Sequence, residues 1–188
     1  MKVPEKHDAS IGIVASELSI SHSRILSRID LSDGARLTLE TVDLEKYDIN
    51  TISATNSEVI LKNSTVKGGN LEMDYPPVWL DNVVWKSENC KIELPGGTAI
   101  CLNNNVQFNS DSDCITSLNS YGSMLRAHQA TFTEFLCIYD QSFAALTGET
   151  TFLAENAQRI SFGAFSDSVV MADQMVFHKI ADPNIRLQ

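Results

Sequence analysis

Three nine-residue stretches decide the fold: RLTLETVDL at 36–44, EVILKNSTV at 58–66 and PVWLDNVVW at 77–85. Near its start, each carries two apolar residues separated by one position. A short polar break follows, and each stretch ends on a bulky residue. A further stretch with apolar residues at alternate positions, such as Ile52-x-Ala54, lies before the next copy begins. Three short segments of period two, recurring about every 22 residues, indicate a solenoid of stacked β-strands.

The repeat covers most of the chain, and we name its three segments first, second and third in chain order. The second members of the first-segment pairs lie 22, 19, 22, 23, 21 and 25 residues apart. The first-segment pairs are Leu37/Leu39, Val59/Leu61, Val78/Leu80, Ile100/Leu102, Ser123/Leu125, Ala144/Leu146 and Val169/Met171. The bulky second-segment residues are Leu44, Val66, Trp85, Phe108, Phe132, Phe152 and Phe177. The third-segment pairs are Ile29/Leu31, Ile52/Ala54, Leu71/Met73, Cys90/Ile92, Cys114/Thr116, Cys137/Tyr139 and Ile160/Phe162.

This pattern predicts an all-β solenoid of about eight rungs of about 22 residues, with three short strands in each rung. We expect residues 1–10 to be a flexible lead and residues 11–180 to form the solenoid domain. Residues 181–188 lose the period, and we expect them to be a C-terminal tail or cap. End rungs of a solenoid expose strand edges that need protection, which is the reason for expecting caps.

The variable rung length and the asparagines that follow the first segment (Asn63, Asn82 and Asn104) place the chain among known architectures. In these features the sequence resembles the right-handed parallel β-helices of the pectate-lyase-like superfamily. The phrases at 33–39 and 122–125 are also similar to autotransporter passenger repeats. The resemblance is one of architecture, and it implies a single-stranded right-handed parallel β-helix.

Several interior features follow from the repeat. The positions two residues after each first-segment pair are predicted corners with a left-handed backbone, which suits Asn, Gly and Asp. These corners are His22, Thr41, Asn63, Asn82, Asn104, Ala127, Gly148 and Asp173. The aromatic second-segment residues are predicted to stack within the core. Cys90, Cys114 and Cys137 share one third-segment position and are predicted to be buried free thiols.

Composition excludes several classes of function. The net charge of −10, with no Lys or Arg from 94 to 125 or from 127 to 158, disfavours a nucleic-acid partner. No apolar run is long enough to span a membrane, and residues 1–8 are too polar to supply the apolar stretch of a secretory signal. We therefore expect a cytoplasmic protein if the chain is full length. No cofactor is predicted, and no metal, because neither a C-x-x-C nor an H-x-x-x-H spacing occurs.

The residues between the inward first-segment pairs should point outward. They are Thr38, Ile60, Trp79, Cys101, Met124, Ala145 and Val170, with Phe143 outward in the same strand, and nearly all are apolar. An exposed apolar stripe of this length predicts an interaction site. The predicted partner-binding residues are Ile60, Trp79, Asp81, Cys101, Met124, Phe143 and Val170. Alternatively, a terminal segment or a second copy of the chain covers the stripe, or in some rungs the inward and outward residues are exchanged.

The sequence carries no diagnostic catalytic set. Asp111 and Asp113 are the candidate carboxylate pair for glycoside hydrolysis, but no third carboxylate occupies a matching position on a neighbouring rung. Arg126, Arg159, His128 and His178 have no acids or nucleophiles at recognisable spacing. We therefore predict that the chain is not an enzyme and has no catalytic residues.

By elimination, the predicted function is non-catalytic protein binding. A small acidic binding protein fits the immunity or antitoxin type, which neutralises a basic toxin by covering its active cleft. One alternative is a glycan-binding or adhesin-like fragment of a secreted β-helix protein, in which Trp79, Tyr75 and Tyr121 would stack on sugars. A further alternative is a polysaccharide lyase or hydrolase.

Overall fold

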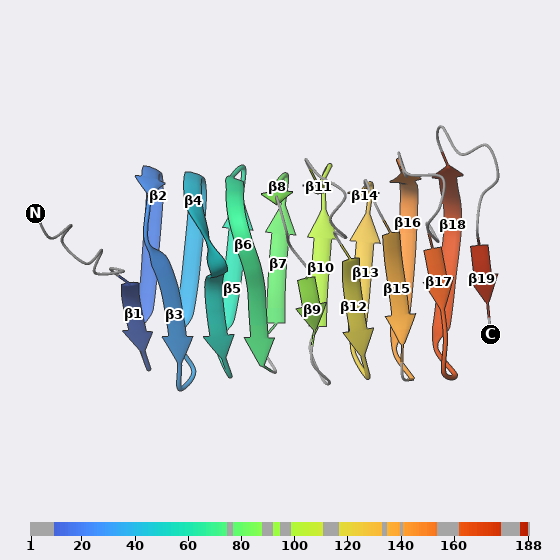
Figure 1. Ribbon diagram of the computed structural model, residues 1–188, viewed down its shortest axis with the longest axis horizontal. Coiled ribbons are helices and arrows are strands. Elements are labelled where there is room, and N and C mark those ends of the chain that lie inside the picture. The colour runs from blue at the N-terminus through green and yellow to red at the C-terminus, as the bar shows by residue number, and fades with distance from the viewer. Residues whose placement is uncertain are drawn as a thin grey trace, which may run out of the picture.

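The computed structural model describes residues 10–74, 77–87, 92–94, 99–110, 117–132, 135–139, 141–153, 162–177 and 185–187. These residues form parallel β-strands stacked as a β-solenoid, and none of them lies in a helix. The strands follow one another along the long axis, with β1 (Ser10–Val14) at one end and β19 (Ile185–Leu187) at the other (Figure 1). The prediction of an all-β parallel solenoid is therefore confirmed.

The first segments stack into a first ladder, in which every described pairing is parallel. Its strands, in order, are β2 (Glu17–Ile25), β4 (Arg36–Thr55), β5 (Glu58–Lys62), β7 (Pro77–Asp81), β10 (Ala99–Asn103), β13 (Met124–His128), β16 (Phe143–Phe152) and β18 (Val169–Phe177). Leu37 pairs with Val59, which pairs with Val78, and all three side chains are fully buried. In these rungs, the residues that point inward are the ones that the sequence predicts.

The second segments stack into a second ladder. It uses the later parts of β2, β4, β16 and β18 together with β6 (Thr65–Asp74), β8 (Val84–Ser87), β11 (Gln107–Ser110) and β14 (Thr131–Phe132). Its bulky residues pair from Leu44 through Phe177 in the predicted order. Phe152 stacks on Phe132 at 5.5 Å and on Phe177 at 5.0 Å between ring centroids. The predicted aromatic column of the core is confirmed.

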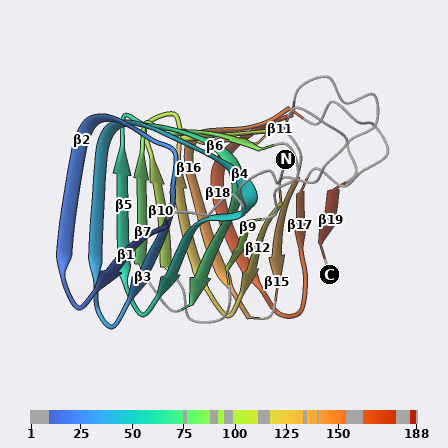
Figure 2. The same cartoon turned by 60° about the vertical axis from the view of Figure 1, so that its left-hand side comes forward.

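The third segments stack into a third ladder, whose strands run opposite to those of the first ladder in Figure 1. Its strands are β1 (Ser10–Val14), β3 (Arg28–Ser32), the ends of β4 and β6, β9 (Ile92–Leu94), β12 (Ser117–Tyr121), β15 (Phe135–Tyr139), β17 (Phe162–Ala164) and β19 (Ile185–Leu187). Strand β19 pairs with β17, so part of the predicted tail extends this ladder. Figure 2 shows the long strands bending around the corner between ladders.

The third ladder differs from the prediction in β15. Leu136 and Ile138 are the fully buried residues of this strand, whereas the predicted inward pair was Cys137 and Tyr139. Leu and Ile bury more apolar surface than Cys and Tyr, which favours this phase. The ring of Tyr139 is then free to stack on Phe165, at 5.0 Å. Cys90 and Cys114 lie outside the described residues.

Two first-ladder pairs also differ from the prediction. In β13 the buried pair is Leu125 and Ala127 rather than Ser123 and Leu125. In β18, Val169 and Met171 are 54% and 62% exposed, while Val170 pairs with the buried Ala144. The period-two pattern alone permits either phase, and a shift of one residue moves every side chain to the other face.

Six of the predicted corners after the first ladder have a left-handed backbone. His22, Thr41, Asn63, Asn82, Asn104 and Gly148 all have positive φ. Asn82 Nδ2 donates to Asn63 Oδ1 at 2.9 Å, which links two rungs along the corner column. The prediction for Ala127 was wrong, because the corner falls two residues later, at Gln129.

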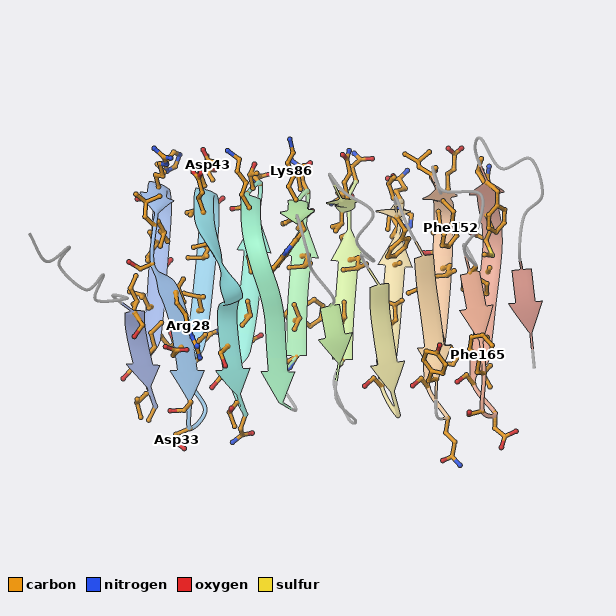
Figure 3. All side chains as sticks on the ribbon, viewed as in Figure 1. Arg28, Asp33, Asp43, Lys86, Phe152 and Phe165 are labelled. Carbon is orange, nitrogen blue, oxygen red and sulfur yellow. The ribbon has the colours of Figure 1, made fainter. Side chains whose placement is uncertain are left out.

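Two labelled phenylalanines lie toward opposite ends of the strands (Figure 3). Phe152 lies toward the end where Asp43 and Lys86 also lie, whereas Phe165 lies toward the opposite end with Asp33. Phe152 is fully buried and Phe165 is half-buried. Interior aromatic stacking therefore lies in the second ladder, where Phe132, Phe152 and Phe177 follow one another.

Candidate partner-binding face

The outward side of the first ladder carries aligned columns of side chains. The middle column consists of Ser19, Thr38, Ile60, Trp79, Cys101, Arg126, Ala145 and Met171. A second outward column lies closer to the first residue of each strand. Its last four members are Ala99, Met124, Phe143 and Val169. We define the Trp79 face as Ile60, Trp79, Cys101, Met124, Arg126, Phe143, Ala145, Val169 and Met171.

The Trp79 face holds a disproportionate share of the exposed apolar surface. Six large hydrophobic residues are exposed in the described part of the chain: Val14, Leu26, Trp79, Met124, Val169 and Met171. Four of the six lie on this face, and their exposures are 43% for Trp79, 46% for Met124, 54% for Val169 and 62% for Met171. Single exposed hydrophobics are ordinary, whereas a contiguous group on one face indicates an interaction site.

Most of the predicted binding residues come together on this side of the molecule. Ile60 pairs with Trp79 and Trp79 pairs with Cys101, as the sequence predicts. Met124 and Phe143 pair with each other and also point outward, in the column nearer the strand starts. Asp81 ends the strand of Trp79, and its Oδ1 accepts a hydrogen bond from Asn104 Nδ2 at 2.8 Å. That bond holds the Asp81 carboxylate at the margin of the face.

The prediction that Val170 points outward was wrong. Its side chain is half-buried and packs against the core, while Val169 and Met171 are the exposed residues of β18. A signal in the sequence could have shown this: a serine stands two residues before several inward pairs. Ser57, Ser123 and Ser142 are buried corner residues that precede Val59, Leu125 and Ala144, and Ser168 precedes Val170 in the same way.

Arg126 is the second residue that sequence reasoning misplaced. It pairs with Cys101 and Ala145, in the middle column where the prediction put Met124. Elsewhere on this side, Arg36 Nε pairs with Glu58 Oε2 at 2.7 Å on the neighbouring rung. No comparable ion pair holds Arg126 within the described part of the chain. The apolar face therefore contains one exposed positive charge.

Cys101 lies between Trp79 and Arg126 and is a free, half-buried thiol. Burial raises the pKa of this thiol, and the nearby Arg126 charge acts in the opposite direction. A raised pKa lowers the fraction of thiolate at neutral pH, and the thiolate is the reactive form. Cys101 should therefore behave as a structural thiol rather than as a nucleophile.

Replacing Arg126 with Gln should make the Cys101 thiol still less reactive. Without the guanidinium, the opposing Coulomb attraction disappears, so the pKa rises further and less thiolate forms at a given pH. We expect iodoacetamide to alkylate Cys101 more slowly in Arg126→Gln than in the wild type near pH 8, as followed by mass spectrometry of its peptide. A faster reaction in the variant would show that Arg126 mainly shields the thiol sterically.

The residues of the other candidate sites do not come together in the part of the chain that the structure describes. Asp111, Asp113, Arg159, His178 and Tyr75 lie outside the described residues. Tyr121 belongs to the third ladder, where it pairs with Tyr139, so it does not share the face of Trp79. In the part that the structure describes, no group of three His, Cys, Asp or Glu residues could hold a metal ion. Among these residues there is also no helix long and apolar enough to cross a bilayer.

Known proteins were compared with the chain in three ways. Comparisons with protein-family models, with curated proteins and with solved structures found no match. The geometry of the Trp79 face is therefore the observation from which a function can be argued.

Proposed function

We propose that this chain is a non-catalytic protein-binding β-solenoid whose binding surface is the Trp79 face. One observation carries the proposal: four of the six exposed large hydrophobic residues in the described chain lie on this face. Strands keep these side chains at fixed spacings, so the surface is organised before a partner arrives. Preorganisation lowers the entropy cost of association.

The dimensions of the face suit the core of a protein interface. From β5 to β18 the first ladder spans five inter-strand spacings, which is roughly 24 Å at about 4.8 Å each. The outward side chains cover about four residues along each strand, or roughly 13 Å, so the apolar area is roughly 300 Å², within the range of functional patches. A standard interface buries about 800 Å² on each partner, so polar residues around the face would form its rim.

Charge favours a basic partner. The chain carries a net charge of −10, which would steer a positively charged protein toward it. A stoichiometric inhibitor of the immunity or antitoxin type is the form of the proposal that fits a small acidic binder. Trp79 is the expected hot spot, because Trp is over-represented among the residues that dominate binding energy.

The finer architecture is part of the same proposal. We take the solenoid to be right-handed, with about eight rungs of three short strands. Two features support it: the spacing of first-segment residues near 22 positions, and the strong preference for right-handed connections between parallel strands.

Affinity capture with three forms of the chain tests the proposed function. Wild type, Met171→Asp and Leu26→Asp each serve as bait, and light scattering measures the stoichiometry of the eluate. Leu26 is a matched control, because it is 59% exposed and follows the second-ladder part of β2, outside the first ladder that carries the Trp79 face. We expect wild type and Leu26→Asp to retain the same basic protein in a 1:1 complex, and Met171→Asp to lose it.

The other outcomes of this experiment are informative. A wild-type chain that elutes as a dimer, and becomes a monomer in Met171→Asp, would show that a second copy covers the face. Retention of the partner by all three forms would place its binding site elsewhere. A monomer that captures nothing would contradict the proposal.

A further inference from the structure

A hollow of about 180 Å³ opens in the surface beside Trp79. In the middle column, Trp79 and Arg126 lie on either side of Cys101, and Ala145 follows Arg126. The hollow exists because the short Cys101 and Ala145 side chains alternate with two long ones. Two strand spacings separate the Trp79 and Arg126 backbones, roughly 10 Å, which leaves room for one flat group between the indole and the guanidinium.

The polar side of the hollow is formed at the strand ends, by Asn103, His128 and Thr147. Thr147 Oγ1 donates to the Ala127 carbonyl at 3.3 Å and lies 3.1 Å from His128 Nδ1. The Thr147 hydroxyl therefore contacts both the His128 imidazole and the backbone of the neighbouring rung.

Gly148 leaves room for this imidazole. A Cβ built at Gly148 would lie 3.0 Å from His128 Cε1 and 3.0 Å from Gln129 Cγ, and the residue has a φ of +62°. A larger residue at this corner would crowd the ring of His128, so glycine leaves the space that the imidazole occupies.

From this geometry we propose that the hollow is a binding site for a carboxylate attached to a flat apolar ring. The ring stacks on the exposed Trp79 indole, and the carboxylate accepts hydrogen bonds from the Arg126 guanidinium, whose planar fork matches a carboxylate. One cation balances one singly charged group, which favours a carboxylate over a phosphate. The volume also fits, since a cavity of about 150 Å³ holds benzene.

The site goes beyond the proposed function, since it needs no protein partner and can be tested on the purified chain. Its ligand could be a free aromatic acid or the C-terminus of a peptide that ends in an aromatic residue. Both offer the same ring and carboxylate, so a direct comparison between them identifies the source.

The two tryptophans provide a reporter and an internal control. Trp79 is 43% exposed beside the hollow, whereas Trp85 is fully buried in the core. In a ¹⁵N-labelled chain they give two indole signals, which the Trp85→Phe variant assigns. The chain is titrated with phenylacetate and with its neutral amide, phenylacetamide, to roughly 50 mM, a range suited to millimolar affinities.

We expect phenylacetate to shift the Trp79 signal saturably, leave Trp85 unchanged and bind about fivefold more tightly than phenylacetamide, as for an exposed charge pair. Arg126→Gln should abolish the preference for the acid. Lys62→Gln, a matched change at another cation on the same ladder, should preserve it. The chain is also titrated with an N-acetylated dipeptide that ends in phenylalanine. Tighter binding of this dipeptide than of phenylacetate identifies a peptide C-terminus as the ligand. Weaker or equal binding identifies a free aromatic acid.

Three results would overturn the proposal. The first is equal binding of acid and amide to the wild type, which would reduce the hollow to an apolar patch. The second is a preference for the acid that survives in Arg126→Gln. The third is the absence of any Trp79 shift over the whole titration.

Discussion

Replacing Phe152 with Ala should lower the free energy of unfolding by about 3–5 kcal/mol. Phe152 is fully buried and contacts three other rings: it stacks on Phe132 and Phe177, and its centroid lies 5.8 Å from that of Phe162 in an edge-on arrangement. Truncation to Ala removes the ring and leaves a cavity that strands on both sides keep open. Denaturation by urea, followed by circular dichroism, measures the loss.

Two variants serve as controls for this prediction. Phe152→Leu keeps most of the volume and should lose clearly less stability than Phe152→Ala. Phe165→Ala removes a half-buried ring whose described stacking partner is Tyr139, and should cost about 1 kcal/mol. If Phe152→Ala costs no more than Phe165→Ala, the second ladder is not the main source of core stability.

Replacing Trp79 with Asp should weaken the partner complex by at least 2 kcal/mol, which is about a 30-fold increase in Kd. The substitution removes the largest apolar side chain of the face and places a charge where the partner excludes water. Because Trp79 is 43% exposed and points away from the core, the fold should remain intact. Calorimetric titration of the captured partner measures the change in Kd.

The matched control is again Leu26→Asp, which makes the same chemical change at an exposed residue outside the face. Its Kd should stay within about twofold of the wild type, since surface substitutions away from an interface contribute little. Circular dichroism and a melting curve establish that both variants fold. A Kd for Trp79→Asp equal to that of Leu26→Asp would remove Trp79 from the interface.

How well each ladder could be predicted from sequence depended on how distinctive its residues are. The bulky residues of the second ladder pair in the predicted order, because Trp and Phe at a recurring position leave one plausible interior phase. In the third ladder Ile52, Ala54 and Phe162 are buried as predicted, and the prediction failed in β15. There the predicted inward pair was Cys137 and Tyr139, two residue types that occur both inside and outside a core. In β15 the buried residues are Leu136 and Ile138, which have the larger aliphatic surface.

The candidate site shows the same dependence on phase. The Ile60–Trp79–Cys101 series was predicted because the first-segment pairs around it are unambiguous aliphatic residues. The prediction misplaces Arg126 and Met171 because it assigns Ser123 and Val169 to inward positions. The structure assigns corners to the serines: Ser142 Oγ accepts a hydrogen bond from Ser123 N at 3.0 Å, between adjacent rungs. Aligning the serines would have corrected both rungs.

The hollow could not have been predicted from the residue pattern alone. Its shape depends on Cys101 and Ala145 lying beside Arg126 on adjacent rungs, and so on a register that the sequence left ambiguous. Its polar side depends on the hydrogen bonds of Thr147 and on the space that Gly148 leaves for His128. Such contacts join residues that lie 19 or 20 positions apart along the chain.

The central claim is that a protein partner covers the Trp79 face, and methionine footprinting tests it most directly. Met124 and Met171 are 46% and 62% exposed on this face, so hydrogen peroxide should oxidise both readily in the free chain. The half-buried Met175 lies in the second ladder and serves as the internal reference. We predict that the captured partner slows oxidation of Met124 and Met171 and leaves Met175 unchanged. Equal oxidation of Met124 and Met171 in the free chain and in the complex would contradict the claim.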